Sequence, residues 1–157
     1  MTQEEFARRI VAMQDTLYRV ATTILPQLCD REDAVQAAIE KAWRGQRSLR
    51  KEEAMGAWVV RILKNECYAL LRRKKREVPS DTLPERETAP DAQQDVYQLF
   101  TSLDQKYRLP MVLYYVEGYS IREISSILRL PQGTVKSQLH RGRMMLRETL
   151  TLEEARK

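Results

Sequence analysis

Residues 117–147, with the sequence EGYSIREISSILRLPQGTVKSQLHRGRMMLR, limit the possible folds of this chain more than any other stretch. Ser120 followed by Glu123 is the pattern of a capping box, in which each side chain bonds the backbone amide of the other residue. Isoleucine and leucine then recur at the spacing of one helix face, and Pro131 disfavours helical geometry at the residue before it. A second helix can begin between Pro131 and Gly133. The segment therefore predicts two helices joined by a tight turn.

The second predicted helix has an apolar face and a polar, basic face. The apolar face consists of Val135, Leu139, Met145 and Leu146. The other face offers hydroxyl, amide, imidazole and basic groups from Thr134, Lys136, Ser137, Gln138, His140, Arg141 and Arg143. A short capped helix, a turn and a longer basic helix are typical of a helix-turn-helix, whose second helix enters the major groove of DNA. The alternative is an ordinary αα-hairpin with a solvated basic face.

Within this helix we expect Gln138 to face DNA. A glutamine side chain can pair with N6 and N7 of adenine, and lysine or arginine can contact guanine or phosphate. Gln138 should therefore contribute to sequence selectivity. Arg141 should strengthen binding more evenly across sequences.

Length and composition indicate a globular protein with one domain of ordinary size or two small ones. The chain has 157 residues, of which 31% are charged and 43% hydrophobic. Apolar runs fall short of the about 18–20 residues needed to cross a bilayer, and the N-terminus lacks the apolar core of a signal peptide. We therefore expect a cytoplasmic protein without membrane insertion. A structural zinc site needs about four ligands. The chain has only two cysteines, Cys29 and Cys67, and one histidine, so we expect neither a bound metal nor a cofactor.

Three helices are expected before residue 77. The apolar side chains of residues 3–25 recur every three or four positions, which predicts one continuous helix. The next helix, capped by Asp30 and Asp33, should bury Trp43 and end near Gly45. The outer side of this helix carries Asp33, Gln36 and Glu40. From the residue types alone, the best interpretation of this side is a helix face exposed to solvent.

The third of these helices should span residues 52–76, with Trp58 packed in the core rather than stacked on a base. It closes with five consecutive cations, Arg72, Arg73, Lys74, Lys75 and Arg76. Cations at a helix C-terminus complement its dipole, but five exceed what the dipole requires. We therefore expect this run to contact nucleic acid.

Residues 77–95 separate two basic blocks and are themselves acidic, with three prolines. This composition predicts a flexible acidic linker between an N-terminal domain of residues 1–76 and a C-terminal domain of residues 96–157. The chain would then have two basic surfaces that face a polyanion, joined by an acidic segment that repels DNA.

The C-terminal domain should contain two helices ahead of the helix-turn-helix. The first carries Val96, Leu99, Phe100 and Leu103 on its apolar face. Asp104 is expected to cap the second, Pro110 to kink it, and Gly118 to stop it in a left-handed conformation. Residues 151–157 give no clear signal and are expected to fray. The predicted fold class is all-α: two small helical domains joined by a flexible acidic linker, the second containing the helix-turn-helix.

The two halves together resemble a bacterial sigma factor of the small, two-domain extracytoplasmic-function type. The resemblance is carried by DREDAVQAAIEKAWR at 30–44, the pattern of Trp58, Ile62 and Asn65, LLRRKKR at 70–76, and GTVKSQLHRGRMMLR at 133–147. Ser125, Gln138 and Gly142 depart from the commonest pattern of the family. Glycine inside a helix is expected to cost about 0.5–1 kcal/mol relative to alanine.

The resemblance implies that the first domain binds core RNA polymerase and captures an unpaired base of the promoter −10 element, while the second reads the −35 element. Under it, Asp33, Gln36 and Glu40 become the candidate polymerase contact. The candidates for the −10 element and nearby phosphates are Arg47, Arg50, Lys51, Asn65, Arg72, Arg73, Lys74, Lys75 and Arg76. It also implies an anti-sigma protein as a further partner.

Two other functions compete with this interpretation. A free-standing helix-turn-helix regulator would use residues 1–76 for dimerisation or sensing, and it would footprint a palindrome without polymerase. An enzyme such as a nuclease is disfavoured, because the sequence offers neither a metal-ligand cluster, nor a nucleophile with its base, nor a glycine-rich phosphate loop.

Overall fold

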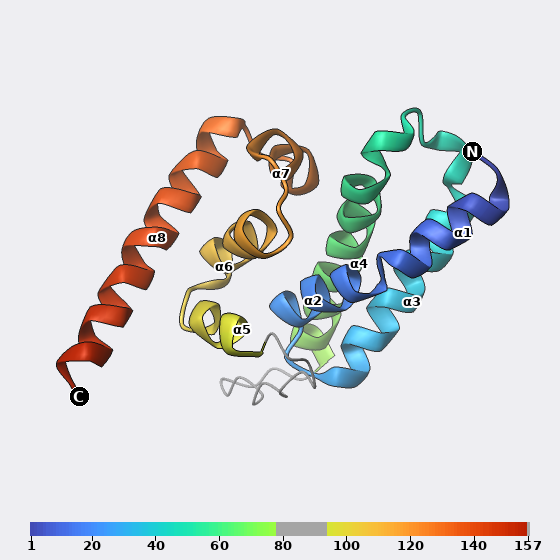
Figure 1. Ribbon diagram of the computed structural model, residues 1–157. Coiled ribbons are helices and arrows are strands. Elements are labelled where there is room, and N and C mark those ends of the chain that lie inside the picture. The colour runs from blue at the N-terminus through green and yellow to red at the C-terminus, as the bar shows by residue number, and fades with distance from the viewer. Residues whose placement is uncertain (78–93, 157) are drawn as a thin grey trace. The chain divides into compact units, whose positions relative to one another are not determined.

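The computed structural model describes residues 1–77 and 94–156. These residues form two compact units, one before and one after residues 78–93 in the sequence (Figure 1). Every regular element within the described ranges is a helix, and the second unit contains the helix-turn-helix. The predicted all-α class is therefore confirmed. Nearly all of the predicted linker, residues 77–95, lies outside the described residues.

The first unit is built from four α-helices. They are α1 (Gln3–Ala12), α2 (Gln14–Ile24), α3 (Leu28–Arg44) and α4 (Met55–Glu77), with the short 3₁₀ turns η1 (Gln46–Ser48) and η2 (Glu52–Ala54) between α3 and α4. The helices α2, α3 and α4 pack against one another around the core of this unit (Figure 1). Leu17, Val35, Val59 and Leu63 are among its fully buried side chains.

The single helix predicted for residues 3–25 is in fact two helices, so that prediction was wrong. The two helices are separated by a turn at Met13, whose φ and ψ of −92° and −2° lie at the edge of the right-handed helical region. The buried side chains Phe6, Ile10 and Leu17 nevertheless continue the apolar stripe across the break. Because the apolar side chains keep the same spacing before and after this one-residue interruption, the interruption cannot be predicted from the hydrophobic pattern.

The start and the end of α3 also differ from the prediction. The N-cap is Gln27, and Asp30 is a buried residue of the first turn rather than the cap. Trp43, expected to point inward, is 42% exposed and meets the ring of Phe6 edge-on at 5.9 Å between centroids. Ala42 takes the buried position beside it.

A buried arginine closes the connection between α2 and α3. Arg31 is 1% exposed, and its Nε and Nη2 donate to the carbonyl oxygens of Leu25 at 2.9 Å and Pro26 at 3.0 Å. These bonds satisfy carbonyl groups where the chain turns from one helix to the next. Arg31 therefore has a structural role that its charge alone did not predict.

Trp58 is partly buried rather than fully enclosed. Its ring meets Phe6 edge-on at 6.5 Å between centroids. This contact supports packing as the role of Trp58, in line with the prediction for it.

The second unit begins with α5 (Gln94–Thr101), α6 (Gln105–Met111) and a π-helical turn, η3 (Val112–Val116). Leu99, expected to face inward, is 40% exposed. Asp104 stands at the N-cap of α6, but its backbone carbonyl, not its side chain, accepts the first amides. Pro110 lies inside α6, where it withdraws one helical donor, and the π turn follows directly after this helix.

The helix-turn-helix consists of α7 (Ile121–Leu128) and α8 (Gln132–Ala155). Its capping box is confirmed: Glu123 N donates to Ser120 Oγ at 3.1 Å, and Ser120 N donates to Glu123 Oε1 at 3.0 Å. Gly118 has the predicted left-handed conformation, with φ at 75°. The helix α7 ends because Arg129 is left-handed, with φ at 55°, one residue before the end that Pro131 predicted.

The helix α8 continues to Ala155, so the prediction of a frayed tail was wrong. Repeated leucine and glutamate, both good helix formers, extend it past the part that packs on α6 and α7. Among the residues that the structure describes, no helix combines the length and apolar character that crossing a bilayer requires.

Candidate nucleic-acid and protein interfaces

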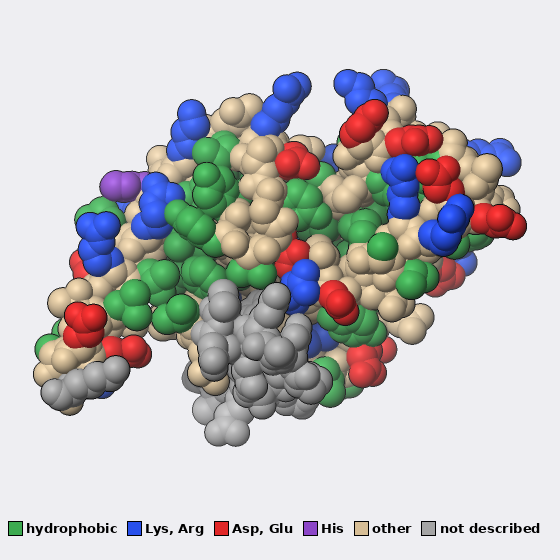
Figure 2. Space-filling view, viewed as in Figure 1, with side chains coloured by type: hydrophobic (Ala, Val, Ile, Leu, Met, Phe, Trp, Pro, Cys, Tyr) green, Lys and Arg blue, Asp and Glu red, His purple; other side chains and the backbone are tan. Residues whose placement is uncertain are grey.

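The first turns of α8 present the polar face expected of a recognition helix. Val135 and Leu139 are buried, which turns the opposite side of α8 to solvent. The side chains on this outward side, called here the α8 basic face, are the half-buried Thr134 and the exposed Lys136, Ser137, His140, Arg141 and Arg143. Figure 2 shows Lys, Arg and His side chains gathered over this helix. The structure thus brings together six of the seven residues predicted for this surface.

Gln138 is the exception, and its predicted orientation was wrong. The side chain is 7% exposed, and within the described residues its Oε1 atom has no hydrogen-bond partner. The reason is spacing: Val135, Gln138, Leu139 and Gly142 occupy positions i, i+3, i+4 and i+7, which form one helix face. Gln138 therefore belongs to the packed side of α8.

A tyrosine from η3 reaches the α8 basic face. Tyr115 Oη accepts a hydrogen bond from Arg143 Nη1 at 3.1 Å. Tyr114 meets Tyr115 edge-on at 4.9 Å between ring centroids, and both rings are exposed. This contact could not be predicted from the sequence, because it depends on how the π turn orients residue 115.

The cations predicted for the −10 element occupy the surface of the first unit. Arg47, Arg50 and Lys51 are exposed on the segment between α3 and α4, and Asn65 is exposed on α4. This segment is held by short local bonds, such as Ser48 N to Gly45 O at 2.9 Å.

The basic run at the end of α4 contains four exposed cations and one that is bound to α3. Arg72, Arg73, Lys75 and Arg76 are exposed. Lys74 instead turns toward α3, where its Nζ lies 2.8 Å from Asp30 Oδ2 and 2.9 Å from Gln27 Oε1. The hydrogen bond to Asp30 is the main reason that the pKa of Lys74 rises above its usual range. Lys74 therefore ties α4 to the start of α3.

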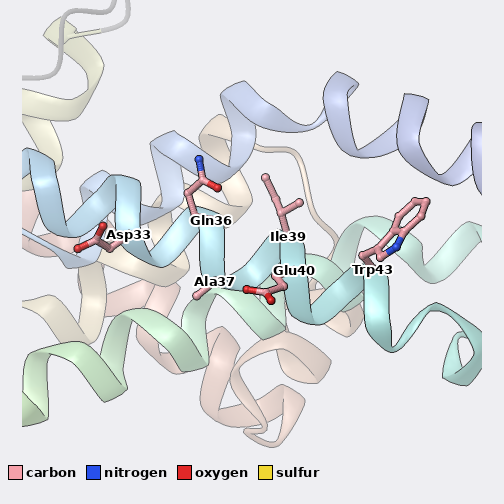
Figure 3. Close-up of a pocket in the computed structure, with 6 residues that line it drawn as sticks. All are labelled: Asp33, Gln36, Ala37, Ile39, Glu40 and Trp43. Carbon is pink, nitrogen blue, oxygen red and sulfur yellow. The ribbon is translucent and has the colours of Figure 1, made fainter.

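The three residues predicted to contact polymerase line one shallow depression on α3. It is formed by Asp33, Gln36, Ala37, Ile39, Glu40 and Trp43, all from the same helix (Figure 3). Glu40 also pairs with Arg44 at 2.5 Å. Sequence reasoning had found the polar members but missed the exposed apolar surface of Trp43. An apolar centre with polar neighbours is the composition of many protein interfaces.

Neither cysteine lies in a cluster of metal ligands. In the part of the chain that the structure describes, His, Cys, Asp and Glu residues form no group of three able to hold a metal ion. Cys29 is exposed, while Cys67 is buried, and this burial raises the pKa of its thiol to about 12.

Two compact units whose described residues form only helices, one of them carrying a basic recognition helix, define a helix-turn-helix DNA-binding protein. Two sequence profiles of one family match the chain: sigma-70 region 2 over residues 10–77 and sigma-70 region 4 over residues 93–146. The RNA polymerase sigma-E factor of Streptomyces coelicolor is 30% identical, with 96% of this chain and 88% of the relative covered. The chain belongs to the sigma-70 family, among the extracytoplasmic-function sigma factors that direct RNA polymerase to promoters.

Other relatives agree with this assignment. The ECF sigma factor SigW of Bacillus subtilis is 29% identical, covering 94% of this chain and 90% of the relative. SigM of Mycobacterium tuberculosis is 32% identical, covering 85% of this chain and 71% of the relative. The family is one of transcription initiation factors rather than enzymes.

Solved structures also resemble the chain. The sigma factor RpoE of Bartonella quintana, in complex with the anti-sigma factor NepR, matches with a TM-score of 0.82 and 28% identity, covering 94% of this chain and 98% of that one. CnrH, in complex with the cytosolic domain of CnrY, matches with a TM-score of 0.70 and 22% identity, covering 96% and 90%. The second similarity concerns the fold alone.

Proposed function

We propose that the two units divide promoter recognition between them. The first unit docks on core RNA polymerase and stabilises the separated −10 strand, and the second unit reads the −35 element through the α8 basic face. The observation that carries this proposal is the separation of surfaces: the depression on α3 and the exposed cations between α3 and α4 belong to one unit, and the recognition helix belongs to the other.

The depression on α3 is the proposed polymerase contact. Asp33, Gln36 and Glu40 offer charge and hydrogen-bonding groups around the apolar surface of Ile39 and Trp43. Burying such apolar side chains supplies affinity, and the acidic groups supply orientation toward a basic partner surface.

A matched pair of charge reversals tests this surface. Asp33→Lys should weaken binding to core polymerase by about tenfold or more, because it places a like charge against a basic partner. Glu32→Lys is the control, since Glu32 is an exposed neighbour on α3 outside the depression. Equal affinities of the two variants would count against the assignment.

The segment between α3 and α4 and the end of α4 are the proposed contacts of the −10 region. Unstacking DNA costs a few kcal/mol per base step, so the separated strand must be stabilised by the protein. A site for an extruded base, lined by Arg47, Arg50, Lys51 and Asn65, and a basic surface along the backbone supply that stabilisation. Arg72, Arg73, Lys75 and Arg76 provide the basic surface, whereas Lys74 is engaged with Asp30.

The α8 basic face is the proposed reader of the −35 element. Lys136 and Arg141 can contact guanine or phosphate, and Ser137 and His140 add hydrogen-bonding groups beside them. Gln138 is excluded from base reading in this proposal because it is buried.

The deciding experiment is run-off transcription with purified core polymerase and a genomic DNA library, with sequencing of the start sites. The chain should redirect initiation to a set of promoters sharing −10 and −35 elements, and it should bind these promoters poorly without polymerase. A palindromic footprint produced by the chain alone would instead favour the free-standing regulator.

The proposal also covers an anti-sigma partner and the cellular compartment in which the chain acts. RpoE of Bartonella quintana was solved with the anti-sigma factor NepR bound, and we infer that a protein of that class holds this chain inactive. Because its work is done on RNA polymerase and DNA, the chain acts in the cytoplasm. It acts as a specificity subunit, without a small-molecule substrate or a catalytic step of its own.

A further inference from the structure

Arg9, on α1, contacts the far end of the segment that links α3 to α4. Its Nη1 donates to the backbone carbonyl of Glu52 at 3.3 Å, although the two residues are 43 positions apart. Its Nη2 lies 3.7 Å from Glu52 Oε2 and 3.1 Å from Glu5 Oε1. One guanidinium group thus joins α1 to both the main chain and the side chain of Glu52.

Glu52 is where the linking segment ends. It is the first residue of η2, which leads directly into α4, and Arg50 and Lys51 come immediately before it. The other Glu52 carboxylate oxygen lies 3.1 Å from the α-ammonium group of Met1. Fixing Glu52 therefore fixes the end of the segment on which the two cations are carried.

The rest of this segment is held by local bonds. Gln46 Nε2 donates to Trp43 O at 2.9 Å, Ser48 Oγ to Gly45 O at 2.6 Å, and Leu49 N to Gln46 O at 3.3 Å. Bonds between near neighbours shape a turn but do not anchor it to the body of the unit, and such segments open at low free-energy cost. The contacts that Glu52 receives from Arg9 and from the Met1 ammonium join the far end of the segment to α1 and the N-terminus.

We propose that Arg9 is a positioning residue for the segment between α3 and α4, holding Arg50 and Lys51 in the orientation that binds the separated promoter strand. The inference rests on the proposed role of this segment at the −10 element. In this proposal Arg9 acts through Glu52 rather than on the promoter strand itself. Its effect comes from preorganising a charged loop, so that the order needed for strand binding is already present in the free protein.

The pair of Arg9 with Glu5 does not account for these contacts. It is a surface pair at positions i and i+4 of one helix, which stabilises a helix only slightly. The bond to the Glu52 carbonyl is directional and joins two elements distant in sequence. A role confined to helix α1 would leave the linking segment unaffected.

The test uses the holoenzyme assembled from core polymerase and the full chain. Arg9→Met removes the guanidinium and keeps an apolar stem of similar length. Arg8→Met is the matched control, because Arg8 is an exposed cation at the next position of α1. The readouts are open-complex formation by permanganate footprinting, binding of a −10 single-stranded oligonucleotide compared with one altered at a single base, and affinity for core polymerase.

Arg9→Met should reduce open-complex formation and the matched-to-altered oligonucleotide ratio by about three- to tenfold relative to Arg8→Met, the size expected for losing one exposed hydrogen bond. Affinity for core polymerase should stay the same. Arg9→Lys should restore part of the loss, because lysine keeps one cationic donor. A global defect would instead lower core affinity and the thermal unfolding temperature together, and that result would overturn the proposal.

Failure of this inference can be told apart from failure of the proposed function. If Arg9→Met and Arg8→Met give the same open-complex yield and the same base ratio, the positioning role is wrong, whatever the segment does. The double variant Arg50→Ala, Lys51→Ala tests the segment itself. If that variant opens promoters as well as the original chain, the assignment of the segment to the −10 strand is wrong as well.

Discussion

The sulfur atom of Met111 lies 2.9 Å from the point that a Cβ atom on Gly142 would occupy, and the Cγ atom of Met111 lies 2.8 Å from it. The helices α6 and α8 therefore approach so closely here that a methyl group on residue 142 would force the Met111 side chain to shift. A glycine inside a helix was expected to lower stability relative to alanine. At this position the packing reverses that expectation, since a tight contact outweighs a preference of about 0.5–1 kcal/mol.

We predict that Gly142→Ala destabilises the chain by about 1–2 kcal/mol, the net of an overpacked contact and a better helix former. Chemical denaturation followed by circular dichroism measures this change. In the background of Met111→Ala, which removes the clashing atoms, the same substitution should become neutral or stabilising. Equal losses in both backgrounds would show that the contact is not the cause.

Gln138→Met is predicted to stabilise the chain by about 1 kcal/mol. Methionine has nearly the same length, and it replaces a buried acceptor that lacks a partner within the described residues. Affinity for a −35 duplex and the preference for it over a scrambled duplex should stay unchanged. Loss of that preference in the folded variant would return Gln138 to the set of base-reading residues.

Lys74 and Arg73 are adjacent cations with different predicted roles. Lys74→Met should lower stability by about 1 kcal/mol, because it leaves the buried carboxylate of Asp30 without its cation. Arg73→Met should leave stability unchanged and reduce the salt dependence of promoter binding by about one unit of slope, as expected for a phosphate contact.

Urea unfolding and binding of forked promoter DNA by the holoenzyme at several salt concentrations separate the two effects. The assignment of Lys74 to structure is contradicted if Lys74→Met changes the salt slope as Arg73→Met does while stability is retained.

The two cysteines should differ sharply toward alkylating reagents. Iodoacetamide at pH 8 is predicted to modify the exposed Cys29 in the native protein, and to reach Cys67 only after unfolding. Burial, with a smaller contribution from the Glu66 carboxylate, raises the pKa of the Cys67 thiol from 9.0 to about 12. Mass spectrometry of peptides from native and urea-treated samples checks this. Equal labelling of both cysteines in the native protein would contradict the prediction.

The raised pKa of the Cys67 thiol also makes the stability of the chain depend on pH in the alkaline range. In the unfolded chain the Cys67 thiol ionises near pH 9.0, whereas in the folded chain it keeps its proton until about pH 12. The contribution of this group to stability is therefore complete below pH 9.0 and is lost as the pH rises toward 12. Cys67→Ala should remove that part of the alkaline decline, at the expense of some core packing.

The helix-turn-helix could be predicted from the sequence because its signals are local. Ser120 and Glu123 are three positions apart, and Gly118 sets its own backbone conformation. Interactions between distant positions gave no such signal. The role of Asp30 depends on Lys74, and the role of Arg31 depends on carbonyl groups exposed where two helices meet.

The error at Gln138 came from trusting residue type over position. Its polarity suggested the solvent side, although its distance from Val135 and Gly142 placed it on the packed face. The prediction for Trp43 was wrong in the opposite direction: its large apolar side chain suggested a core position, but it is exposed. The smaller Ala42 fills that place, and the tryptophan remains available at the surface of α3.

The length of α8 limits how much of it any groove can enclose. Its 24 residues extend over about 36 Å, at about 1.5 Å per residue. The major groove is about 12 Å wide, so a helix inserted by its first turns has its last turns beyond the edge of the duplex. Changes near Leu150 and Leu152 should therefore act on neighbouring proteins or on solubility, while the choice of base pairs stays with the first third of the helix.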